Sequence, residues 1–74
     1  MYTIELDISH EATKAEVAEF AMTHNCAALL IEEFGPAGEN PLYQFFSNSY
    51  DSLLELATEI LQDSSHAKEL IEVA

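Results

Sequence analysis

The chain has 74 residues, which leaves room for one compact domain, residues 1–74, and for no second hydrophobic core. Its 14 Asp and Glu oppose two Lys and no Arg, so the formal net charge is −12. Such a field repels nucleic acid and anionic membranes and attracts basic surfaces. The composition therefore excludes direct binding to nucleic acid or to anionic membranes as an expected function.

Hydrophobic residues make up 49% of the chain, which excludes an acidic disordered tail. The single cysteine, Cys26, excludes an intramolecular disulfide framework, and we expect it to be a small buried residue in a reducing compartment. The sequence contains no apolar stretch of 18 residues and no positively charged segment before an apolar run at its start. We therefore expect neither a membrane span nor a signal peptide, and a cytoplasmic location.

The first half of the chain predicts a strand, a helix and a second strand. Residues 2–9 alternate between apolar and polar side chains, as in a half-buried strand with an acidic outer face. Ser9 is expected to cap the helix that follows, which has an apolar side and ends at His24 and Asn25. The near-continuous apolar run over residues 26–34 then predicts a well-buried strand.

The second half begins at residues 35–41, which hold both glycines and both prolines and predict a tight, ordered hairpin loop. Residues 42–47 form an aromatic-rich strand, and Asn48 or Ser49 caps a Leu-rich helix. The tail has two interpretations. Helical spacing favours a short terminal helix capped by Ser64 or Ser65, and the alternative is a fourth strand over residues 70–73.

The predicted fold class is α+β, with the order β-α-β-β-α followed by a helix or a strand. We expect a small, largely antiparallel sheet with helices packed on one face, either ferredoxin-like or a truncated version of that fold. The second and third strands carry large apolar groups on both sides, so some of them should be exposed in a monomer. An exposed patch of this kind indicates self-association or a partner site.

Four acids recur every four residues along the predicted second helix, and no Lys or Arg lies between Ser49 and Ser65. A step of four residues advances about 6 Å, so these carboxylates would form one row, and three like-charge steps cost about 1 kcal/mol. We expect this row to contact a partner, with Glu16 and Glu19 of the first helix as a second group. The residues of the row are Asp51, Glu55, Glu59 and Asp63.

Solubility and adaptation to salt would also account for an acidic chain. The row can be a solvated face that keeps the protein soluble, which requires only a modest net charge. The acidity can also be an adaptation to high salt, in which case the protein unfolds at low salt and refolds in molar salt. In the partner-binding interpretation, Glu5 and Asp7 on the outer side of the first strand extend the acidic surface.

The sequence contains no pattern typical of a catalytic, metal or cofactor site. The three histidines, His10, His24 and His66, have no second ligand at a metal-type spacing. We expect His24 to lie with its polar groups satisfied at the border of the core. The loop over residues 35–41 lacks the Lys and the Ser or Thr of a phosphate-binding loop. We therefore expect a protein that is not an enzyme and that holds no metal or cofactor.

The loop sequence Gly-Pro-Ala-Gly-Glu-Asn-Pro-Leu-Tyr at residues 35–43, after an apolar strand ending Ile31-Glu32-Glu33-Phe34 and before a Leu-rich helix, resembles small bacteriophage-encoded proteins of uncharacterised function. The resemblance covers roughly residues 27–62. In size, acidity and mixed α/β pattern the chain is similar to phage inhibitors of host defence, namely DNA-mimicking restriction and uracil-glycosylase inhibitors and acidic anti-CRISPR proteins. These proteins share no fold, so no functional residue is carried over.

The resemblance implies a class of mechanism and a place in the host cell cytoplasm. The leading hypothesis is a non-catalytic phage-type inhibitor that occupies a basic, nucleic-acid-facing surface of a host defence or nucleic-acid-processing protein. The alternative hypothesis is a small homodimeric structural or assembly protein whose open sheet face forms the dimer and whose acidity serves only solvation.

Overall fold

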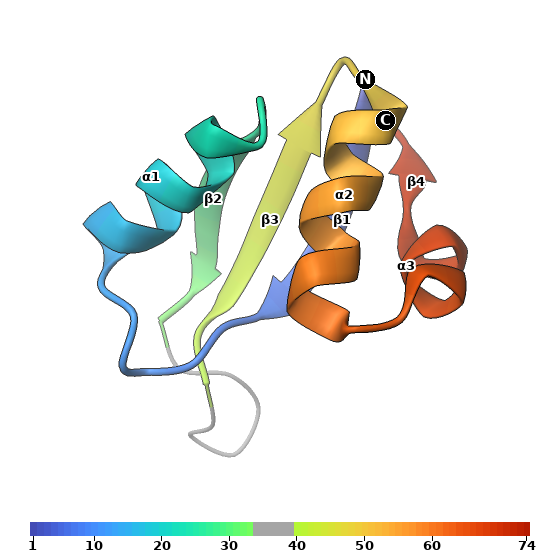
Figure 1. The fold of residues 1–74 in the computed structure, drawn as a ribbon. Helices are drawn as coiled ribbons and strands as arrows, with labels where there is room; N and C mark the ends of the chain where they lie inside the picture. Colours follow the sequence, from blue (N-terminus) through green and yellow to red (C-terminus); the bar gives the residue numbers. More distant parts are fainter. Residues whose placement is uncertain (34–39) are drawn as a thin grey trace.

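The computed structural model describes residues 1–33 and 40–74 (Figure 1). Most of the hairpin loop that the sequence predicts at residues 35–41 lies outside the described residues. Strands and helices follow one another in the order expected from the sequence. They are β1 (Tyr2–Asp7), α1 (Lys14–Thr23), β2 (Ala27–Glu32), β3 (Leu42–Ser47), α2 (Tyr50–Leu61), α3 (Ser64–Leu70) and β4 (Glu72–Val73).

The described strands form one antiparallel sheet in the order β2-β3-β1-β4. β3 lies between β1 and β2, which is the split arrangement of a ferredoxin-like sheet, and β4 completes it beside β1. Figure 1 shows α1 and α2 on the same side of the sheet, with α3 next to α2. The structure thus confirms the predicted α+β class and the helices packed on one face.

The tail contains both of the alternatives that the sequence left open. α3 is the expected short helix, and the two residues of β4 then pair with Tyr2 and Thr3 of β1. The expected cap at Ser64 or Ser65 is wrong, because the carboxylate of Asp63 accepts the backbone N–H of His66 at 3.1 Å. An aspartate accepts this bond as well as a serine does, so the helix begins one residue earlier.

The cap of α1 also differs from the expectation. Ser9 accepts the backbone N–H of Glu11 at 3.2 Å within a turn, and the helix begins later, after Thr13. Thr13 and Glu16 form a reciprocal capping box, which satisfies two backbone donors and therefore outcompetes a single serine. The predicted cap of α2 at Ser49 is confirmed, since its hydroxyl accepts the backbone N–H of Ser52 at 3.2 Å.

The core lies between the helices and one face of the sheet. Alternate residues of β1 and β3 point into it, and the largest fully buried side chains are Phe45, Ile4, Leu53 and Leu56. Cys26 is 8% exposed, as expected, and burial raises the pKa of its thiol. The thiol lies 3.3 Å from the carbonyl oxygen of His24, to which it donates.

The opposite face of the sheet carries exposed apolar side chains, as the sequence predicts. Leu29 is 53% exposed and Ile31 is 42% exposed, while Leu42 and Phe46 are half-buried. The prediction of a well-buried second strand is wrong, because β2 is an edge strand and only one of its faces is covered. The apolar run of β2 thus has one partly buried face against the helices and one exposed apolar face.

The left-handed residue at the end of α2 offers a test of the local backbone. Gln62 has a φ of 59°, which costs a side chain with a Cβ about 1 kcal/mol. Gln62→Gly is expected to raise the free energy of unfolding by about 0.5 kcal/mol in urea titrations. Asn25→Gly is the control at a φ of 58°, where asparagine is already tolerated, and an equal gain there would contradict this account.

Candidate partner-binding surface

The acidic row is present over three of its four predicted residues. Asp51, Glu55 and Glu59 lie on α2 and are all exposed. Asp63 does not continue the row, because α2 ends at Leu61, Gln62 turns the chain, and the Asp63 carboxylate caps α3. The row therefore has two like-charge steps, which cost about 0.4–1 kcal/mol, and Asp51 in the first turn is stabilised by the helix dipole.

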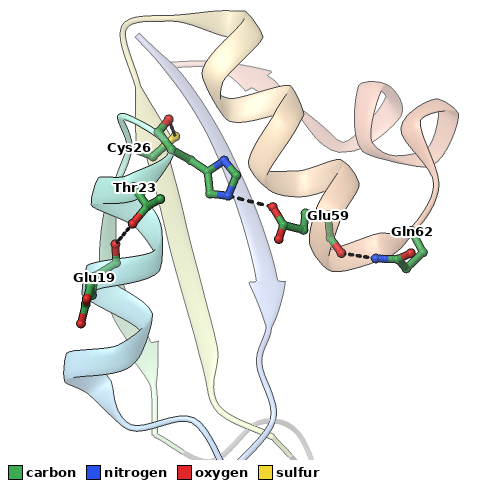
Figure 2. Close-up of polar contacts among 6 residues, drawn as sticks. Glu19, Thr23, Cys26, Glu59 and Gln62 are labelled. Atoms are coloured by element: carbon green, nitrogen blue, oxygen red, sulfur yellow. Dashed lines mark hydrogen bonds and ion pairs between the residues drawn. The ribbon is translucent and has the colours of Figure 1, made fainter.

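Glu59 makes a contact that its spacing on α2 does not predict. Its carboxylate Oε2 lies 2.8 Å from Nε2 of His24, the residue at the end of α1, and Figure 2 draws this contact. It is the only ion pair within 4 Å among residues 1–33 and 40–74, and it is charged on both sides only when His24 is protonated. The ring of His24 also packs edge-on against Phe20, with 4.8 Å between ring centroids.

His24 thus lies at the core border with its polar group satisfied, as expected, and it joins α1 to α2. The sequence indicated the position of His24 but not its contact with Glu59. Helical spacing placed His24 on the inner side of α1, but the distance to Glu59 depends on how two separate helices pack on the sheet. One carboxylate of the row is therefore already engaged within the protein.

Glu16 is exposed and its carboxylate serves the capping box of α1. The backbone N–H and then the hydroxyl of Thr13 hold the pKa of the Glu16 carboxyl below its ordinary value. Because folding lowers this pKa, the ionised Glu16 carboxylate stabilises the fold at pH values above the ordinary pKa. This stabilisation is lost as the pH falls through the pKa of the folded state. The Glu16 carboxylate is thus already engaged at the start of α1.

The capping box is tested by Thr13→Ala. Loss of the hydroxyl is expected to lower the free energy of unfolding by about 1 kcal/mol. NMR titration of the side-chain carboxyl should show the pKa of Glu16 rising only part of the way to its ordinary value, because the backbone N–H, the larger cause, remains. Thr23→Ala in the same helix is the control, and a shift of the Glu16 titration there would refute the assignment.

Glu19 is exposed on α1, as the remaining member of the second predicted group. Its backbone carbonyl accepts the hydroxyl of Thr23 at 2.9 Å, which Figure 2 shows, so this contact does not involve the carboxylate. Glu16 also lines an apolar surface hollow of about 280 Å³ between the helices, beside Phe20 of α1 and Ile60 of α2. The acids of α1 and α2 therefore belong to one helical layer.

We define the acidic helical surface as the exposed acids of this layer that the sequence singled out. Its residues are Asp51, Glu55, Glu59, Glu16 and Glu19. Glu5 and Asp7 lie on the other side of the molecule, because their neighbours Ile4 and Leu6 point into the core beneath the helices. The expectation that the strand acids extend the helix row into one surface is thus wrong.

Lys68 of α3 reaches the edge of the acidic helical surface. It lines a surface hollow of about 470 Å³ between α2 and α3 together with Asp51, Glu55 and Glu59. The spacing of residues along α2 does not predict this cation, because α3 folds back beside α2 after the turn at Gln62. The row is consequently acidic along its length and bordered by one lysine.

In the part of the chain that the structure describes, no group of three or more His, Cys, Asp or Glu is placed to hold a metal ion. None of the described helices combines the length and the apolar character needed to cross a membrane. Comparison with protein-family models, with curated proteins and with solved structures found no match for this chain. The physical character of the surface is therefore what supports a function.

Proposed function

We propose that this chain is a non-catalytic binding protein that docks on a basic, nucleic-acid-facing surface of another protein through its acidic helical surface. The observation that carries the proposal is the exposure of acidic groups. Glu39 lies outside the described residues, and every other Asp and Glu of the chain is exposed. Against them stand two lysines in the whole sequence.

The amount of charge supports a role beyond solubility. A small domain stays soluble with a net charge of about 2–8, whereas this chain carries −12. Self-repulsion at this charge opposes the compact state and accelerates encounter with a basic partner at low salt. A function that uses the acidic groups explains why the sequence keeps them although their repulsion lowers the stability of the fold.

The geometry of α2 supports an imitation of nucleic acid. Asp51, Glu55 and Glu59 follow one another in steps of about 6 Å and present carboxylate oxygens to solvent. Lys and Arg side chains that bind phosphate form the same charge-assisted hydrogen bonds with carboxylates. More specifically, we propose an inhibitor of the phage type, which blocks a host defence or nucleic-acid-processing protein by occupying its nucleic-acid channel.

The experiment is affinity capture from bacterial lysate at low salt, with elution by a salt gradient. The bait is the full chain, and the matched baits each carry three fewer negative charges. One has Asp51→Asn, Glu55→Gln and Glu59→Gln in α2, and the other has Glu5→Gln, Asp7→Asn and Glu72→Gln on the sheet side. We expect a nucleic-acid-binding protein on the wild-type and sheet-side baits and its loss from the α2 bait; equal retention on all three would overturn the proposal.

A second candidate is a homodimeric structural or assembly protein, favoured by the exposed apolar residues Leu29 and Ile31. In that case sedimentation at micromolar concentration shows a stable dimer, and the α2 amide substitutions cost no function. A monomer in sedimentation excludes this candidate at the concentration measured.

A further inference from the structure

The face of the sheet opposite the helices carries an apolar stripe along β2 and the neighbouring strand β3. Exposed side chains of β2 alternate along it, and those of β3 lie beside them, because Phe46 pairs with Ala27 and Gln44 with Leu29. The register shifts between Leu30 and Glu32, so Glu32 pairs with Leu42, and Ile31 between them is 42% exposed. We define the apolar stripe as Ala27, Leu29, Ile31, Leu42 and Phe46.

The dimensions of the stripe match one helix. From Ala27 to Ile31 a strand advances about 13 Å, and two strands are about 5 Å apart. An α-helix places anchors at i, i+3 or i+4, and i+7 over about 10 Å. One amphipathic helix can therefore lay three successive anchors along the stripe.

The charges beside the stripe are all negative among the described residues of this face. Glu5 and Asp7 lie on the same side of β1, next to β3, and Glu72 of β4 pairs with Thr3. Glu5 and Glu72 line a surface hollow of about 250 Å³ together with Gln44 and the half-exposed Leu70. Such a hollow fits a Lys or Arg side chain, with its stem on Leu70 and its head between two carboxylates.

This charge pattern argues against a second copy of the chain as the occupant. Lys14 lies in α1 and Lys68 in α3, so a sheet-to-sheet dimer would bring only acids beside Glu5 and Glu72. Like charges placed together at an interface oppose association. The complementary partner is apolar along one line and basic beside it.

We propose that the open sheet face binds a basic amphipathic helix of a partner protein. The apolar residues of that helix lie on the stripe, and a Lys or Arg enters the hollow between Glu5 and Glu72. This surface is on the other side of the sheet from the acidic helical surface, so the inference stands independently of the proposed function.

The probe is a synthetic peptide of about 18 Leu and Lys residues, with Leu at i, i+3, i+4 and i+7 positions, titrated into the full chain at about 0.15 M salt. Screening over about 8 Å then reduces attraction to distant acids. Leu29→Glu is expected to weaken binding at least tenfold, although it makes the chain more acidic. Ala18→Glu, at an exposed position of α1, adds the same charge and should leave the affinity unchanged or slightly tighter.

A second pair of measurements places the peptide. Glu5→Gln with Glu72→Gln should weaken binding about fivefold and reduce its salt dependence, and amide NMR shifts on peptide addition should concentrate in β2 and β3. Equal affinity of Leu29→Glu and Ala18→Glu, or shifts confined to α2, would overturn the inference. If the chain forms a dimer that Leu29→Glu dissociates, then the stripe binds a second copy of the chain and not a partner helix, and the inference is overturned. The α2 amide variant should bind this peptide normally, so failure here is distinct from failure of the proposed function.

Discussion

Replacing Phe45 with alanine is expected to lower the free energy of unfolding by about 3–5 kcal/mol, which is most of the stability of a domain this small. Phe45 is 0% exposed and pairs across the sheet with Ile4 on β1 and with Ala28 on β2, so its loss leaves a cavity in the middle of the core. Urea unfolding followed by circular dichroism measures the change.

The adjacent Phe46 is the matched control. It points to the open face and is half-buried, between Ala27 and Thr3. Phe46→Ala should therefore cost about 1 kcal/mol or less. If the two substitutions destabilise equally, or Phe46→Ala more, then both faces of the sheet are covered in solution and the assignment of an open face is wrong.

The second large effect concerns binding. The variant with Asp51→Asn, Glu55→Gln and Glu59→Gln is expected to bind a captured basic partner about 100-fold more weakly, since three exposed charge contacts contribute about 1 kcal/mol each. Its stability should change little, because relief of two like-charge steps offsets the lost contact between Glu59 and His24. Isothermal titration calorimetry and urea unfolding measure the two quantities.

The control for binding carries the same change of charge elsewhere, with Glu5→Gln, Asp7→Asn and Glu72→Gln. Loss of affinity in this control and not in the α2 variant would show that the partner binds the sheet side of the protein. An equal, small loss in both would mean that only the overall field attracts the partner.

Period-2 and period-3.6 patterns were sufficient to predict the order of strands and helices, the antiparallel sheet and the alternation of buried and exposed side chains in β1. They were not sufficient for strand order, because the run over residues 26–34 is equally apolar whether its strand is central or at an edge. The predicted helix cap was also wrong where two residues can each accept a backbone N–H near the helix start, as Ser9 and Thr13 do before α1.

The candidate surface was predictable only within one helix. Spacing alone identified Asp51, Glu55 and Glu59 as neighbours, and their exposure on α2 agrees with it. Spacing failed at Asp63, because the left-handed turn at Gln62 is not encoded by glycine or proline and so was not visible in the sequence. The position of Lys68 in the hollow beside α2 and the contact of His24 with Glu59 depend on how helices pack, which no periodicity along the chain specifies.

In the proposed binding mode, the acidic helical surface occupies the place of nucleic acid on the partner protein. The most direct measurement is a competition between this chain and labelled duplex DNA for the nucleic-acid-binding protein that it captures, followed by fluorescence anisotropy. We expect the wild-type chain to displace the DNA completely and the α2 amide variant to require about 100-fold more protein for the same displacement. A ternary complex of partner, DNA and wild-type chain, or equal displacement by the α2 variant, would contradict it.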